Sequence, residues 1–450
     1  MPATGGEFIA ISIRNSEEDR LQSCSPPVWS PDSRHILVSV RTLKALRYEW
    51  WLIDVAARAA RQTRAITDMM SEGYPQPVLA GIAPQAWLRD GTVLTKGFAS
   101  GAIGIWAVKL DPMSGRLKGK PLKLLAPPTE VRWFSMAGAR LLFSGGETLG
   151  GLDVMPFDLD AARPLGHSSS FRRNNPGGYG YLSLSTDGRI LSFSSRQSSG
   201  ATPEAFAVDL ASGKETKIPE PSPNSPSAKQ YTAISTDGKR VAYGAVVAKG
   251  RPLYIWDSIR GTSDLIMPDC GCRPLSWTPD GLAFLVYLPD TRPQPIAFFN
   301  IGTHTFADIL QSATNDLNAA QVSPNGTKIA FTTSRGALFI APFRAPRSTP
   351  ETEWQQVDAG GRVVAFFWSP NGQRIYFAVP DDQDGTRILS QRFRIDGRPF
   401  GAPEEIYRTD WRSNFGYALG AEIVGGGTRI VGVRGAVTAD LWTASLEGAR

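Results

Sequence analysis

The sequence predicts an all-β protein, a single β-propeller of eight or nine four-stranded blades, and three observations support this. A short turn phrase returns nine times at intervals of 43 to 58 residues, and in seven of the copies it ends in Asp or Asn, usually followed by Gly. A run of β-forming residues follows each copy, and helical periodicity is nearly absent. A period of roughly 40 to 50 residues is typical of propeller blades. Since propellers usually have about four to eight blades, a ninth repeat also raises the alternative that one unit is a distorted insertion.

Each repeat contains the chemistry of a tight turn. Pro presets φ in several copies, and Asp or Asn followed by Gly supplies a short polar side chain and positive φ. The clearest copy is Trp277-Thr278-Pro279-Asp280-Gly281, and the copies near 137 and 427 keep Gly but lack Asp. The turns are predicted at the following nine positions: Asp32, Asp90, Ala137, Asp187, Asp237, Asp280, Asn325, Asn371 and Gly427.

The residues around each turn predict the strands of one blade in order. An apolar segment ends at the turn, and a second strand follows it, as in residues 190–195. A third, aromatic strand comes ten to twenty residues later, as in Leu253-Tyr254-Ile255-Trp256-Asp257, and a short basic strand such as residues 212–218 completes several units. Four such antiparallel strands make one blade. Only residues 55–70 resemble a helix, and a loop or an outer strand explains them equally well.

The chain is predicted to form one domain over residues 1–450, because no linker-like segment divides it. Residues 1–24 resemble the third and fourth strands of a blade whose first hairpin lies elsewhere, and the last repeat stops after a third strand. Pairing of these N-terminal strands with the C-terminal blade would close the ring and remove two exposed sheet edges. The protected edge would include Ile430, Val431, Val433 and Trp442. Any upstream sequence would then join in the middle of a blade.

The repeat phrase and the aromatic third strand resemble TolB-like and WD-repeat-like bacterial propellers. Residues 105–116 and 440–444 are particularly similar to the branch in which a propeller follows a serine/threonine kinase or a winged-helix domain. The resemblance covers nearly the whole chain and implies an extracytoplasmic location. The chain contains neither a kinase catalytic loop nor a winged helix, so the activities of those domains are not implied. The propeller of the prolyl oligopeptidase family is also similar, but its hydrolase domain is missing.

The charge and hydropathy exclude several partners. The net charge of +6 is spread over the turns, whereas nucleic-acid binding requires clustered basic residues and a reading element. No stretch approaches the roughly 18 apolar residues of a membrane span. The N-terminus lacks the basic and apolar regions of a signal peptide. We therefore expect no nucleic-acid partner, no membrane span, no export signal in this sequence, and a monomer.

The sequence offers few candidates for chemistry. Cys270 and Cys272 are too closely spaced for an ordinary zinc pair, and His35, His167 and His304 lie in separate repeats, so free thiols in a turn are expected. Asp381, Asp382 and Asp384 resemble the start of a calcium loop but lack its distal Glu. The repeated turn aspartates are explained by turn chemistry. No serine-hydrolase elbow, phosphate loop or zinc-protease motif is present. No catalytic, metal or cofactor-binding residue is therefore predicted.

The sequence favours a non-enzymatic binding, scaffold or sensor propeller. A protein, peptide or small ligand would bind at the funnel of the central channel or at the rim, within a larger bacterial signalling protein. The alternative is an enzyme, a lyase or a hydrolase, that acts with polar residues of the channel. An enzyme would be expected to place several His, Asp or Glu residues near the channel, and the chain has three His. Binding is therefore preferred, although fold alone does not establish it.

Overall fold

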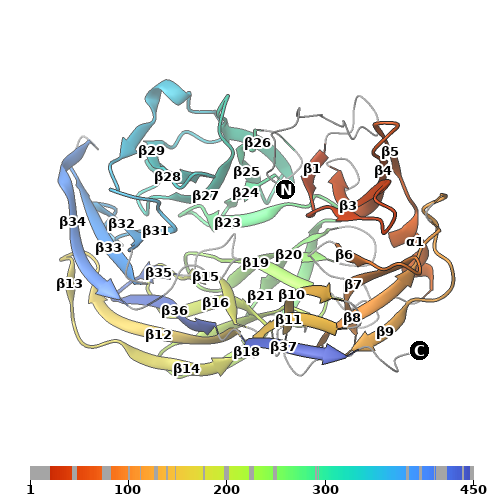
Figure 1. Ribbon diagram of the computed structural model, residues 1–450. Coiled ribbons are helices and arrows are strands. Elements are labelled where there is room, and N and C mark those ends of the chain that lie inside the picture. The colour runs from red at the N-terminus through yellow and green to blue at the C-terminus, as the bar shows by residue number, and fades with distance from the viewer. Residues whose placement is uncertain are drawn as a thin grey trace. The chain divides into compact units, whose positions relative to one another are not determined.

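The computed structural model confirms an all-β architecture (Figure 1). The residues that it describes form 37 strands, one short α-helix and one turn of 3-10 helix. They are the following: 21–42, 48–72, 83–99, 102–111, 113–125, 130–137, 140–146, 148–175, 178–196, 202–221, 228–246, 251–288, 291, 293–381, 385–394, 398–409, 411, 423–437 and 440–445.

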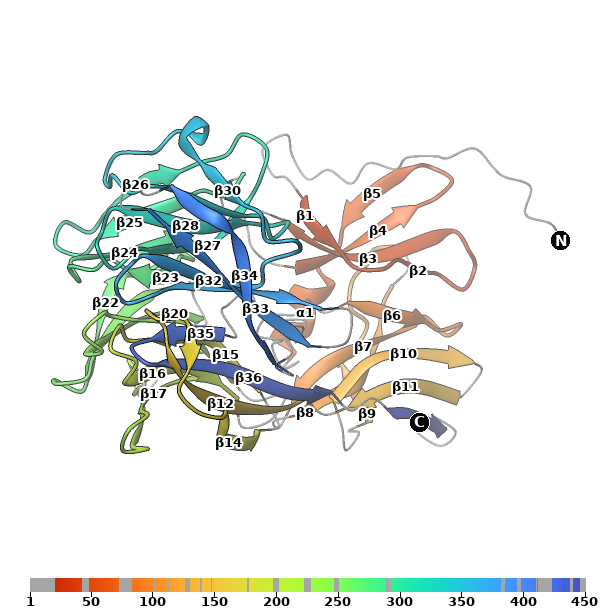
Figure 2. The same cartoon turned by 90° about the vertical axis from the view of Figure 1, so that its left-hand side faces the viewer.

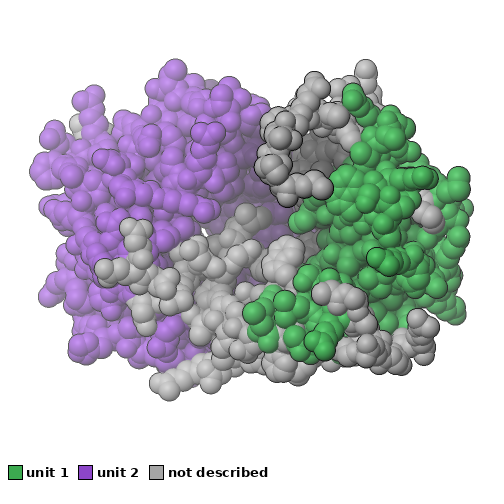
Figure 3. Space-filling model, in the orientation of Figure 1, with its two compact units in different colours: residues 1–147, 437–450 green, residues 148–436 purple. Residues whose placement is uncertain are grey.

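The chain divides into two compact units (Figure 3). Unit 1 comprises residues 1–147 and 437–450, and unit 2 comprises residues 148–436. The single domain expected from the sequence stays a prediction.

Unit 1 contains three antiparallel sheets. Apolar side chains fill the spaces between the first and second and between the second and third, with Trp50, Trp87 and Val93 in one cluster and Phe134 and Phe143 in another. The strands of the first sheet are β1 (Leu21–Cys24), β2 (Val28–Trp29), β3 (His35–Thr42), β4 (Tyr48–Asp54) and β5 (Ala59–Gln62), followed by α1 (Ala65–Ser71). The second has β6 (Pro84–Trp87), β7 (Thr92–Ala99), β8 (Ala102–Lys109) and β9 (Leu122–Leu125), and the third has β10 (Glu130–Ala137), β11 (Arg140–Gly146) and β37 (Asp440–Ser445).

Unit 2 contains six antiparallel sheets. Five of them are four-stranded meanders of consecutive strands. These are β15 (Tyr179–Leu184), β16 (Ile190–Ser195), β17 (Glu204–Asp209) and β18 (Glu215–Lys217); β19 (Ala228–Ile234), β20 (Arg240–Val246), β21 (Leu253–Asp257) and β22 (Thr262–Met267); β23 (Arg273–Trp277), β24 (Ala283–Tyr287), β25 (Ile296–Asn300) and β26 (Thr305–Leu310); β27 (Leu317–Val322), β28 (Lys328–Thr333), β29 (Leu338–Pro342), the 3-10 turn η1 (Glu351–Glu353) and β30 (Gln355–Val357); and β31 (Ala365–Trp368), β32 (Arg374–Pro380), β33 (Thr386–Phe393) and β34 (Pro399–Thr409).

The sixth sheet of unit 2 combines strands from the two ends of the unit. Its order is β35 (Ile423–Gly426), β36 (Arg429–Val437) and β12 (Thr148–Asp158), and β13 (Arg163–Pro164) and β14 (Ser169–Asn175) both pair with β12. Both ribbon views show β36 alongside β12 (Figures 1 and 2). The sheet is therefore assembled from segments that are far apart in the sequence.

The first strands of these six sheets form a closed circuit. β15, β19, β23 and β27 contact one another in order, and β35 contacts both β31 and β15. Trp368 in β31 donates a hydrogen bond from its indole to the carbonyl of Gln321 in β27, with a length of 3.2 Å. The amide of Gly427 donates to the carbonyl of Thr186 at 2.8 Å. Unit 2 is thus a ring of six blades that closes on itself.

All nine predicted turns lie where two consecutive strands that pair with each other are connected. In the turn between β19 and β20, the Ser235 hydroxyl donates to Asp237 Oδ1 at 2.6 Å, and the amide of Lys239 donates to the same oxygen at 3.1 Å. The Ser235 hydroxyl oxygen in turn accepts from the amide of Arg240 at 2.9 Å. The same three bonds recur around Asp32, Asp187, Asp280, Asn325 and Asn371. These side chains therefore make the hydrogen bonds of a structural turn.

The predicted closure of the ring is corrected by the strand pairing. Residues 21–24 form β1 and pair with β3 in the first sheet, so they do not complete the last blade. Residues 1–20 lie outside the described part of the chain. β36 lies between β35 and β12, so the part of the expected edge at Ile430, Val431 and Val433 is covered by other strands, whereas β37, which contains Trp442, pairs on one side with β11 among the described strands. The count of eight or nine blades in one ring is not confirmed.

Candidate functional site

The central channel of unit 2 is narrow at the end where the repeat turns lie. A cavity there is lined by residues from all six inner strands or their turns, and its volume is about 70 Å³. A water molecule in the liquid takes up about 30 Å³, and ligand pockets usually measure about 300–1,000 Å³. This end of the channel therefore has room for water and not for an organic ligand.

The lining of this cavity is uncharged. It consists of hydroxyl, amide and apolar groups: Ser183, Leu184, Thr186, Ile234, Thr236, Ser276, Trp277, Pro279, Gln321, Val322, Pro324, Trp368, Pro370, Gly425 and Gly426. Several of its polar side chains already bridge neighbouring blades. The Ser276 hydroxyl donates to the Ala320 carbonyl at 2.9 Å, and the Thr236 hydroxyl donates to the Pro279 carbonyl at 3.3 Å. These groups hold the ring together.

A cluster of three tyrosines and one arginine is formed by residues of β15, β19, β23 and β24. We call Tyr181, Tyr231, Arg273 and Tyr287 the aromatic cluster. The rings of Tyr181 and Tyr231 are 4.6 Å apart between centroids. The guanidinium carbon of Arg273 lies 4.6 Å from the ring centre of Tyr231 and 5.0 Å from that of Tyr287. Distances below about 6 Å allow cation–π attraction, so the arginine in β23 holds one tyrosine ring from β19 and one from β24.

The backbone conformation at Tyr181 and Tyr231 explains the orientation of their side chains. Tyr181 and Tyr231 have φ of 55° and 59°, in the left-handed region that large residues rarely adopt. Each sits at an irregularity in the register of its strand, between Gly180 and Ser183 in β15 and between Gln230 and Ala233 in β19. Such bulges redirect a side chain and are frequent next to functional sites. The Thr232 hydroxyl donates to the Tyr181 carbonyl at 2.7 Å and joins the two bulges.

Burial fixes the ionisation of Tyr181, and a hydrogen bond fixes the position of Tyr287. Burial raises the pKa of Tyr181, and the neighbouring Tyr231 raises it further, so Tyr181 is neutral at physiological pH. The hydroxyl of Tyr287 donates to Gln294 Oε1. Tyr181, Tyr231 and Arg273 are all half-buried. The cluster is therefore a preformed and partly accessible surface with aromatic faces and one cation.

The sequence contains a signal for this cluster, although no site residue was predicted from it. Tyr181 and Tyr231 each stand six residues before the turn aspartate of their repeat, at Asp187 and Asp237. A large aromatic residue at the same position of two successive repeats indicates a shared surface.

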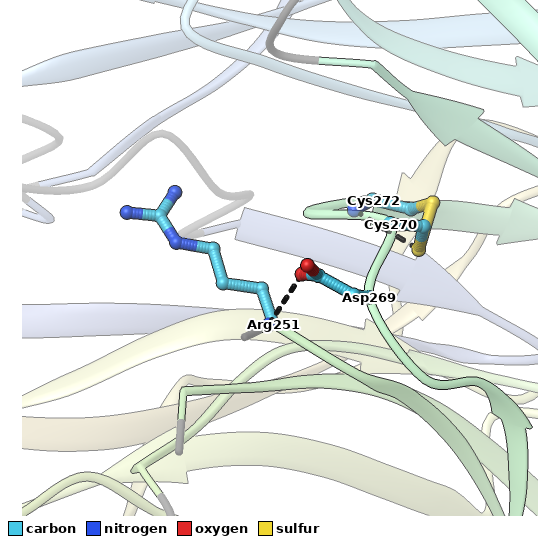
Figure 4. Close-up of a disulfide and its surroundings, with 4 residues drawn as sticks. All are labelled: Arg251, Asp269, Cys270 and Cys272. Carbon is cyan, nitrogen blue, oxygen red and sulfur yellow. Dashed lines mark hydrogen bonds between the residues drawn. A yellow bond between two sulfur atoms is a disulfide. The ribbon is translucent and has the colours of Figure 1, made fainter. Parts of the chain in front are cut away.

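Cys270 and Cys272 require a correction, because they form a disulfide (Figure 4). The bond joins residues two positions apart in the segment before β23. The amide of Arg251 donates to Asp269 Oδ1 at 3.0 Å, and the Arg251 side chain extends away from the sulfur atoms (Figure 4). The expected free thiols are therefore wrong for this pair.

The other candidate ligands are not brought together in the part of the chain that the structure describes. Asp381 accepts hydrogen bonds from the Gly385 amide at 2.8 Å and from Arg408 at 3.1 Å, whereas Asp382 and Asp384 lie outside the described residues. His35 begins β3, and His167 and His304 lie in separate loops. Among the described residues, no group of three or more His, Cys, Asp or Glu side chains could hold a metal ion. The described helices include none that is long and apolar enough to cross a membrane.

Comparison with known proteins finds solved structures that are similar at low sequence identity. No protein-family model and no curated protein matches the sequence. A putative TolB from Agrobacterium tumefaciens is 17% identical with a TM-score of 0.47, and the match covers 65% of this chain and 99% of that one. TolB from Acinetobacter baumannii is 14% identical with a TM-score of 0.36, covering 81% and 78%. The Cps50 (Swd1) β-propeller domain from Myceliophteria thermophila is 12% identical with a TM-score of 0.36, covering 49% and 67%.

The similarity concerns the fold alone. The chain is similar at low identity to these propeller proteins. At these identities no residue and no activity is carried over from those proteins, and the ring of unit 2 follows from its own strand contacts.

Proposed function

We propose that this chain is a non-enzymatic binding propeller, and that the aromatic cluster of unit 2 docks a peptide or an exposed segment of a partner protein. The juxtaposition of Tyr181, Tyr231 and Arg273 carries the proposal. Tyrosine and arginine are enriched among the residues that supply most of the binding energy in protein interfaces. Rigid aromatic rings provide contact area at a low entropic cost.

The geometry of the channel supports binding over catalysis. Its lining at the turn end has no carboxylate or imidazole among the described residues, and such groups are the usual general acids and bases. The strain at Tyr181 and Tyr231 is maintained by the surrounding ring, which pre-organises the surface. In a larger bacterial signalling protein the propeller would be the sensor or scaffold part.

The experiment that tests this function is selection of random 12-residue peptides on phage against the intact chain. Selected peptides are then measured against Arg273→Gln and against Arg392→Gln, which removes another arginine that lies over an aromatic ring, that of Phe400 in the same unit. We expect Arg273→Gln to weaken binding by about thirtyfold, since hot-spot side chains contribute about 2 kcal/mol or more. Arg392→Gln should leave binding unchanged. Peptides that bind both variants equally well would place the docking surface elsewhere.

A further inference from the structure

A second hollow of unit 2 lies at the blade that closes the ring. Its volume is about 350 Å³, within the range of small-molecule pockets. The residues that line it come from β12, β34, β36 and the segments around β14: Asp153, Ser168, Ser170, Tyr407, Arg408, Thr409, Trp411 and Arg434. None of them belongs to the aromatic cluster.

Asp153 is the buried anion of this pocket. Its Oδ2 atom accepts a hydrogen bond from the indole of Trp411 at 3.2 Å and lies 3.3 Å from Nε of Arg434. Its Oδ1 atom is also buried but has no hydrogen-bond partner in the described structure. A buried carboxylate oxygen without a donor is costly and needs an explanation, such as water, an ion or a ligand. The pocket beside it offers room for that donor.

Each charge around the pocket has an opposite charge beside it, and Glu405 also lies 3.9 Å from Arg387. Asp153 is paired with Arg434. Arg408, which is 53% exposed at the rim, is paired with Asp381 at 3.1 Å and with Glu405 at 3.3 Å. An ammonium group at Asp153 would therefore face the Arg434 guanidinium, and a carboxylate at Arg408 would face Glu405. Neither a cation nor an anion gains much attraction, whereas a neutral hydroxyl can donate to Asp153 and accept from an arginine without a charge penalty.

We propose that this pocket binds a neutral polyhydroxylated ligand, a saccharide. One hydroxyl donates to the unpartnered Oδ1 of Asp153, and other hydroxyls accept from Arg408 or Arg434. The hydroxyls of Ser168 and Ser170 add groups that can donate or accept. The ligand satisfies the buried oxygen, and the site is separate from the peptide-docking surface.

The test is saturation-transfer-difference NMR on the full chain with glucose, galactose, N-acetylglucosamine, maltose and trehalose, and with glycine and glutamate as charged comparisons. We expect at least one sugar to bind at millimolar concentration and both amino acids to give no signal. Asp153→Asn should weaken the sugar by about tenfold, because the acceptor becomes a neutral amide oxygen, which accepts a weaker hydrogen bond than a carboxylate, and the ion pair with Arg434 is lost. Arg408→Gln, which changes a rim residue, should weaken it by a smaller factor.

The matched control is Arg260→Gln, which removes an arginine of similar exposure, 54%, paired with Asp257 and Asp264 in the same unit. It should leave sugar binding unchanged. If Asp153→Asn fails to fold, the sugar affinity of Arg408→Gln alone tests the proposal. Absence of any sugar signal with the folded wild-type chain, binding of an amino acid in place of the sugars, or sugar binding that survives the pocket variants would each overturn the proposal.

Discussion

Replacement of the turn aspartate Asp237 should destabilise the protein by about 1 kcal/mol. Asp237→Ala removes the acceptor of two hydrogen bonds, from the Ser235 hydroxyl and from the Lys239 amide. Each such bond contributes about 0.5–1.5 kcal/mol. Because the Asp237 side chain is 50% exposed, water replaces part of what is lost, and the lower end of the sum applies. The bond from the Arg240 amide to Ser235 Oγ stays in place.

The other repeats of the chain supply the control, Asp237→Asn. Asn325 and Asn371 occupy the same turn position in their repeats. Each accepts a hydrogen bond from the equivalent serine hydroxyl of its own repeat, at 2.7 Å and 2.8 Å. An asparagine at 237 should therefore preserve both bonds and leave stability nearly unchanged at pH 7. Urea unfolding of the wild type and both variants, followed by tryptophan fluorescence, measures the difference. A loss with Asp237→Asn as large as with Asp237→Ala would contradict the hydrogen-bond explanation.

The carboxylate also predicts a pH dependence. Burial raises the pKa of Asp237, but the bonds from Ser235 and Lys239 outweigh it, and the pKa lies below its ordinary value. The folded state therefore favours the ionised form. Its contribution is complete above the unfolded-state pKa of about 3.9 and is lost as the pH falls through the lower folded-state pKa. The stability difference between the wild type and Asp237→Asn should change in that acidic window alone.

Two further predictions concern the closing blade and the disulfide. Gly426→Ala should destabilise unit 2 by about 1–3 kcal/mol, because a Cβ there would lie 2.4 Å from the Ser185 carbonyl oxygen. The control Gly180→Ala has open space around its Cβ and should be neutral or slightly stabilising. Equal melting temperatures for the two variants would argue against the contact of β35 with β15. Because Cys270 and Cys272 form a disulfide, the unfolded chain should react with Ellman's reagent at one of its three cysteines before reduction and at all three after reduction. Three reactive thiols without reductant would exclude the disulfide.

The turns and the strands beside them could be predicted from the sequence because the residues that determine them are adjacent in the chain. Every repeat turn lies between two consecutive strands that pair with each other, and the Asp-Gly and Asn-Gly pairs supply the required backbone, as with Gly238 at φ 72°. The choice of partner strand is not local. The alternating pattern of residues 21–24 suits any antiparallel neighbour, and nothing in it distinguishes β3 from the last blade. Closure of the ring likewise depends on β12 and β36, which come from opposite ends of unit 2.

The candidate sites were predictable to different degrees. The two tyrosines of the aromatic cluster occupy one repeat position, so a comparison of repeats can find them. Asp153 and Trp411 are 258 residues apart, and only the folded chain places them in one pocket. The free oxygen of Asp153 depends on which donors happen to reach it, and no sequence pattern reports that.

The most direct test of the closed six-bladed ring is to produce residues 148–436 alone. A closed ring predicts a monomer with β-type circular dichroism and one cooperative melting transition, because β12 pairs with β36 and completes the sixth blade. Residues 159–436 lack β12 and leave an edge of β36 unpaired, so this shorter chain should aggregate or melt at a lower temperature. Identical melting of the two fragments, or a longer fragment that fails to fold, would contradict closure of the ring within unit 2.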